Sequence, residues 1–169
     1  DDLELLDYRV ELDKDAPEVT LLIPEGRADA HYAGFGWVPI SGLNFEDVPN
    51  PNTIWSILDN NILTHSEDVT LVWHNQKGLV FERTISIDEN FMFTITQRVE
   101  NSTDKEIALH PYGLLKRHGL PQDLKNFFIL HEGLVRMSDG ELEEASYMGS
   151  CFFKSQCTME DFKFDERDR

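Results

Sequence analysis

The feature that most constrains this sequence is a series of alternating apolar segments between residues 68 and 99. In residues 68–74, 79–85 and 91–99, apolar side chains recur at every second position, and many of the positions between them are polar. Successive side chains of an extended strand point to opposite faces, so this period of two is typical of β-strands with one buried face. Polar turns at 76–78 and 88–90 separate the segments. We therefore predict an antiparallel meander of three consecutive strands.

The same alternation predicts which side chains share the buried face of the meander. Because directly paired residues of neighbouring strands point the same way, one set of apolar residues has to lie together on one side. The set that we expect to be buried there is Leu71, Trp73, Phe81, Phe93 and Ile95.

The rest of the chain continues the strand-rich pattern. Further β-prone runs lie at 19–23, 107–110 and 127–131, and Gly, Pro, Asn and Asp separate them. A helical period is clear nowhere, and the best candidate, 52–63, predicts one or two turns at most. Parallel sheets need crossover helices that this sequence does not supply. The predicted fold is an all-β, antiparallel β-sandwich with at most short helices.

Composition limits the class of partner. The chain has 169 residues, 40% of them hydrophobic, which is enough for the core of one domain. Its 32 acidic residues against 15 basic ones give a net charge of −17, which disfavours nucleic acid and direct binding to anionic lipid. No apolar run approaches the roughly 20 residues of a membrane-spanning helix. The start at Asp1 suggests a processed or excised piece of a longer protein.

No catalytic or metal-binding motif stands out. The six histidines are not spaced as a ligand motif, and there is no nucleophile elbow or phosphate-binding loop. Paired carboxylates are abundant simply because the chain is acidic. We therefore expect no catalytic residue, no metal and no cofactor. We expect Cys151 and Cys157 to be free thiols, with a local disulfide as the alternative in an oxidising compartment.

A group of large aromatic residues provides the one candidate contact site. Tyr32, Phe35, Trp37 and Trp55 could line a groove for an extended peptide or a polyether-like ligand. Large aromatic residues in a sandwich more often belong to the core. Both interpretations stay open at this point.

Several segments resemble the first periplasmic domain of YidC-type membrane protein insertases of Gram-negative bacteria. The similarity lies in the order and spacing of residues 1–8, 17–22, YAGFGW at 32–37, the meander, PYGLLKR at 111–117 and LHEG at 130–133. Together these segments span roughly residues 1–147. Residues 148–169 match poorly and are expected to form a charged, peripheral tail.

The resemblance implies a β-supersandwich similar to the galactose mutarotase fold, incomplete at both ends in this chain, at the periplasmic face of the bacterial inner membrane. The parent protein would be embedded in the membrane. The implied function is that of an accessory or scaffolding domain with no enzyme activity, which assists insertion and folding of inner-membrane proteins, as a chaperone does in protein transport. Its partners would be translocon subunits or nascent membrane-protein segments. The alternatives are a carbohydrate-binding or aldose-epimerase-like supersandwich protein and a structural spacer domain.

Overall fold

The structure, a computed structural model, describes residues 2–121, 124, 131–138 and 140–147. Within this part of the chain, strands dominate and the only helix is one short 3-10 turn. In order, the elements are β1 (Leu3–Arg9), β2 (Glu18–Leu22), β3 (His31–Ser41), η1 (Phe45–Asp47), β4 (Ser56–Ile57), β5 (Val69–His74), β6 (Leu79–Ile87), β7 (Phe93–Asn101), β8 (Ala108–Arg117), β9 (Gly133–Ser138) and β10 (Glu141–Ser146). The predicted all-β, antiparallel fold class is confirmed. No helix in the described ranges is long and apolar enough to cross a membrane.

The described residues form two compact units. The middle unit is the continuous segment Phe35–Gly113, and the terminal unit consists of the described residues before and after it. Strands β3 and β8, which pair with each other, each contribute residues to both units.

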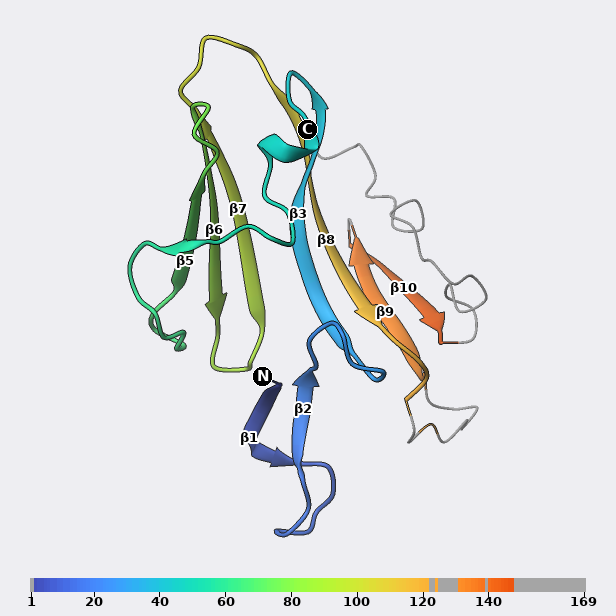
Figure 1. Cartoon of the computed structure of the whole chain (residues 1–169). Coiled ribbons are helices and arrows are strands. Elements are labelled where there is room, and N and C mark those ends of the chain that lie inside the picture. Colours follow the sequence, from blue (N-terminus) through green and yellow to red (C-terminus); the bar gives the residue numbers. More distant parts are fainter. Residues whose placement is uncertain (1, 122–123, 125–130, 139, 148–169) are drawn as a thin grey trace. The chain divides into compact units, whose positions relative to one another are not determined.

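The middle unit contains the predicted meander. Its four-stranded sheet has the order β4-β5-β6-β7, in which each strand pairs antiparallel with its neighbour. Figure 1 shows β5, β6 and β7 running side by side in alternating directions. A threonine pair crosses the outer face, where the Thr70 and Thr84 hydroxyl oxygens lie 3.1 Å apart.

The register confirms that the five predicted core residues share one face, but the extent of burial differs from the prediction. Trp73 pairs with Phe81, and Ile85 with Ile95, so these side chains point the same way. Phe81 is fully buried, whereas the other four predicted residues are only half-buried. The buried core cluster is centred on Phe81 and leaves the far end of β7, near Phe93, partly open to solvent.

The core of the middle unit joins the sheet to β3. Trp37 of β3 is 5% exposed and packs edge-on against Phe81, with ring centroids 5.1 Å apart. Val48 and Leu79 complete the buried cluster. The packing of β3 against one face of the sheet gives this unit two layers.

The structure decides two local predictions, and the second of them was wrong. Residues 52–63 contain no helix, which agrees with the predicted limit of one or two turns, because the amide of Leu58 donates to the Thr70 carbonyl and the segment pairs with β5 as the short strand β4. The last strand of the meander begins at Phe93 and not at Phe91, because Phe91 adopts φ +61° in the preceding turn.

The terminal unit contains two small antiparallel pairs. Strand β1 pairs with β2, and β9 pairs with β10 in a hairpin in which Met137 lies opposite Leu142. The strand expected over 127–131 falls almost wholly on residues outside the described ranges. The expected tail, 148–169, with Cys151 and Cys157, lies outside them entirely.

Candidate functional site

The middle unit holds a cluster of aromatic side chains around one arginine, which we call the aromatic–arginine cluster: Trp37, Trp55, Phe81 and Arg83. Trp37 and Trp55 are stacked, with ring centroids 6.4 Å apart and planes inclined by 30°. The Arg83 guanidinium carbon lies 4.9 Å from the centre of the Trp55 ring and 5.7 Å from that of Trp37. Both distances allow cation–π attraction, which fixes the side chain of Trp55 against the core.

Arg83 stands at an inward-facing position of β6. The register pairs it with Leu71 on β5 and with Gln97 on β7, so its side chain points into the same layer as Phe81. Its Nη2 atom donates to the backbone carbonyl of Phe35 at 2.6 Å, whereas its buried Nε has no hydrogen-bond partner within the described residues. Burial lowers the pKa of the Arg83 guanidinium. The guanidinium therefore ties β3 to the sheet, although it is a poorly solvated cation.

A hollow of about 480 Å³ opens beside this cluster, where β7 lies next to the β8 segment. Most of its wall is apolar, and polar groups stand among the apolar ones. The lining residues are Trp37, Gln97, Val99, Asn101, Glu106, Ile107, Leu109 and Pro111. Glu106 is the one titratable residue in this lining, so the hollow does not bring an imidazole and a carboxylate together as sugar epimerisation would require.

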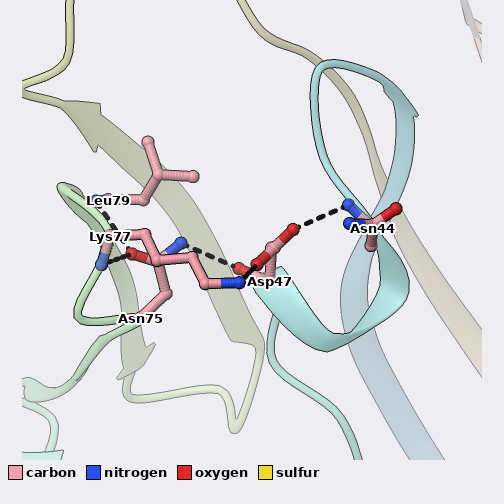
Figure 2. Close-up of polar contacts among 5 residues, drawn as sticks. All are labelled: Asn44, Asp47, Asn75, Lys77 and Leu79. Atoms are coloured by element: carbon pink, nitrogen blue, oxygen red, sulfur yellow. Dashed lines mark hydrogen bonds and ion pairs between the residues drawn. The ribbon is translucent and has the colours of Figure 1, made fainter.

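A second polar group holds η1 against the β5–β6 turn, and we call it the Asp47 latch: Asn44, Asp47, Asn75 and Lys77. Figure 2 shows these side chains and the backbone of Leu79 converging. The Lys77 ammonium is 2.6 Å from Asp47 Oδ1, and the Asn44 amide donates to Asp47 Oδ2 at 2.8 Å. Asp47 is only 5% exposed, so these bonds compensate the burial of its carboxylate.

Asn75 forms the other half of the Asp47 latch. Its Oδ1 accepts from the amides of Lys77 and Leu79, at 2.8 and 3.0 Å, and its Nδ2 donates to the Asp47 carbonyl at 3.2 Å. The hydrogen bond from Lys77, followed by that from the Asn44 amide, holds the pKa of Asp47 below its usual range. The same pairing raises the pKa of Lys77. The latch is therefore a pre-paired structural site with no free acid or base for catalysis.

The four aromatic residues of the predicted groove have different positions. Trp37 and Trp55 come together in the aromatic–arginine cluster, and Phe35 joins them through its backbone carbonyl. Trp37 is 5% exposed and belongs to the buried core cluster, and it also lines the hollow.

Tyr32 belongs to the terminal unit, whereas Phe35, Trp37 and Trp55 belong to the middle unit. Its hydroxyl donates to Glu25 at 2.7 Å, and its ring lies edge-on to His118, with centroids 6.1 Å apart. Burial, and then the hydrogen bond to Glu25, raises the pKa of Tyr32 to about 12. The hydroxyl is already paired within the chain.

Arg83, Gln97 and the Asp47 latch were not identified from the sequence. A signal for Arg83 was present, since it occupies an inward position of the 79–81–83–85 series. The latch joins residues roughly thirty positions apart in the chain, for which the sequence carries no local signal. Among the described residues, no group of three or more His, Cys, Asp or Glu could hold a metal ion.

Comparisons with known proteins match this chain to one family. The model of the family described as the YidC periplasmic domain matches residues 1–150. A membrane protein insertase YidC of Ruegeria sp. (strain TM1040) is 56% identical over 147 residues, which cover 87% of this chain and 24% of the relative. The protein of the same name from Ruegeria pomeroyi is 51% identical over 152 residues, covering 87% and 25%. No solved structure matches.

The chain spans about a quarter of the length of these relatives. The match includes the meander, the aromatic–arginine cluster and the Asp47 latch, all of which lie within residues 1–150. This confirms the resemblance noted from the order of segments. The chain belongs to the family of YidC periplasmic domains.

Proposed function

We propose that this chain is a non-catalytic accessory domain of a membrane protein insertase, and that it assists insertion and folding of inner-membrane proteins by binding polypeptide on the periplasmic side. The family of this chain is the observation that carries the proposal. Each relative named above is called a membrane protein insertase and is about four times as long as the matched segment. We take residues 1–147 as this domain and 148–169 as a peripheral tail.

The hollow beside β7 supports binding of protein. Within the described part of the chain, β7 pairs with β6 on one side and with no strand on the other. Backbone groups along a free strand edge can pair with an extended polypeptide, and an adjoining apolar hollow can take one of its side chains. Val99 and Leu109 would contact that side chain.

The charge of the chain supports the same class of partner. A net charge of −17 repels anionic head groups and phosphate backbones, so the long-range field disfavours lipid and nucleic acid. Protein partners remain, either translocon subunits or segments of membrane proteins during synthesis. Polypeptide binding needs no metal, cofactor or catalytic group.

Photo-crosslinking in the membrane tests this proposal. A full-length insertase that carries this chain would contain benzoylphenylalanine in place of Leu109, with a control probe in place of the exposed Asn61. We expect protein adducts from position 109 with a newly made inner-membrane protein or a translocon subunit, and none from position 61. Adducts with lipid alone, or none from position 109, would contradict the proposal, and saturable sugar binding would favour the carbohydrate alternative.

A further inference from the structure

The hollow beside β7 is lined by a side-chain amide with incomplete hydrogen bonding. Gln97 donates from Nε2 to the Tyr112 carbonyl at 3.4 Å, whereas its Oε1 atom is buried and has no hydrogen-bond partner among the described residues. A carbonyl can only accept, so the bond to Tyr112 fixes which end of the amide carries the oxygen. A buried acceptor without a donor is unusual in a folded domain and calls for an explanation.

The backbone of β7 would direct an added strand towards this atom. The Asp88 amide donates to the Met92 carbonyl at one end of the β6–β7 pairing. At the other end the Ser102 amide donates to the Gly78 carbonyl, so the even-numbered residues of β7 bond to β6. The backbone groups of Gln97 therefore point away from β6, to the edge that no described strand covers. A residue placed opposite Gln97 on an added strand would have its side chain on the same inward face, in the hollow.

The surroundings of Gln97 determine the chemistry of that side chain. Val99, Leu109 and Pro111 give the hollow apolar walls, so its occupant needs an apolar body. Arg83 lies directly opposite Gln97 on β6, with its guanidinium in the same layer, so a second cation beside Gln97 would be repelled. The donor therefore has to be neutral. Because the acceptor is buried, the donor also has to stand at the far end of the side chain, as it does in tyrosine.

We propose that the hollow is a tyrosine-selective subsite for an extended polypeptide paired with β7, in which Gln97 Oε1 accepts a hydrogen bond from the tyrosine hydroxyl. The inference rests on the proposed function and names the side chain that the partner presents there. The bond to Tyr112 is long and the terminal torsion of a glutamine is broad, so the amide can turn its oxygen to the ligand. The ring would pack between the apolar walls.

Labelled peptides test the subsite on the full-length insertase in nanodiscs. The probes are short peptides of alternating valine and threonine that differ only in a central tyrosine, phenylalanine or leucine, and fluorescence anisotropy gives the Kd of each. We expect the tyrosine peptide to bind about fivefold more tightly than the phenylalanine peptide, since the two differ by one hydrogen bond. Equal binding of these two peptides would overturn the inference.

A substitution assigns the preference to its acceptor. Gln97→Met keeps the length of the side chain and removes the amide oxygen, so the preference for tyrosine over phenylalanine should disappear. The matched control is Thr96→Val, at an exposed position of the same strand that faces the opposite side, and this variant should keep the preference. A preference that persists in Gln97→Met would show that the hydroxyl binds elsewhere, and the inference would be wrong.

The outcomes separate this inference from the proposed function. If the probe at position 109 gives protein adducts but the tyrosine and phenylalanine peptides bind equally, the domain binds polypeptide and only its side-chain preference has been assigned wrongly. If no peptide binds, the inference is overturned, and crosslinking at position 109 decides the proposed function. The comparison of the two peptides uses the unaltered protein, so it tests the inference even if Gln97→Met fails to fold.

Discussion

Replacing Asn75 by alanine should remove the central hydrogen bonds of the Asp47 latch. Asn75 is 9% exposed and makes three bonds through one side chain, to the amides of Lys77 and Leu79 and to the carbonyl of Asp47. Alanine offers neither the acceptor nor the donor. We expect the strands themselves to keep their fold, so the structural effect of the change should be confined to η1 and the β5–β6 turn.

The polar groups that lose their hydrogen-bond partner determine how much stability is lost. Leu79 is 2% exposed, so its amide would lose its acceptor where water cannot easily replace it, and the Asp47 carbonyl would lose its donor. The Lys77 amide is only partly buried and can turn to water. An unsatisfied buried group costs about 1–3 kcal/mol, so two of them predict a loss of about 2–6 kcal/mol. Against a typical stability of about 5–15 kcal/mol, such a loss is large.

Urea unfolding of the chain, followed by tryptophan fluorescence, measures this loss. Trp37 and Trp73 both contact Phe81 in the middle unit and report on its packing. We expect a lower midpoint with an unchanged slope, since the surface exposed on unfolding stays the same. Asn61→Ala, at an exposed site, should stay within about 0.5 kcal/mol of the original protein. A loss below about 1 kcal/mol for Asn75→Ala would refute the view that the latch holds η1.

Three further predictions follow from single contacts. Arg83→Met should stay within about 1 kcal/mol of the original stability, because Met keeps the apolar stem and removes a buried cation. Arg83→Lys should lose about 1–2 kcal/mol more, because Lys keeps the charge without the planar stacking. If urea unfolding showed Arg83→Lys to be the more stable of the two variants, the charge itself would be needed. Gly36→Ala would place a Cβ 2.6 Å from the Tyr112 hydroxyl, so it should lower the free energy of unfolding in urea by about 1–3 kcal/mol. Adding Tyr112→Leu should restore part of this stability. The pKa of Tyr32 is raised to about 12 from an ordinary value of 10, so its contribution to stability is complete below pH 10 and is lost as the pH rises towards 12. Tyr32→Phe should abolish this part of the alkaline loss of stability. If the variant showed the same slope of stability against pH between these values, the loss would not be due to Tyr32.

The meander could be predicted from the sequence because a period of two determines which side chains share a face. It predicted correctly that Trp73 and Phe81 lie together, as their pairing in the register confirms. The extent of burial could not be predicted, because it depends on which layer packs above the sheet. Trp37 supplies that layer from β3, far away in the sequence, and its contact with Phe81 is non-local.

Arg83 and Phe91 were harder to predict because each breaks a local rule. Arg83 is a charged residue at an inward position, whereas a period of two is recognised by its apolar residues. Phe91 continues the apolar alternation of 91–99, which suggested a strand, but the carboxylate of Asp88 bonds the amides of Asn90 and Met92 and bends the backbone into a turn. A side-chain acceptor two and four residues before those amides competes with strand pairing.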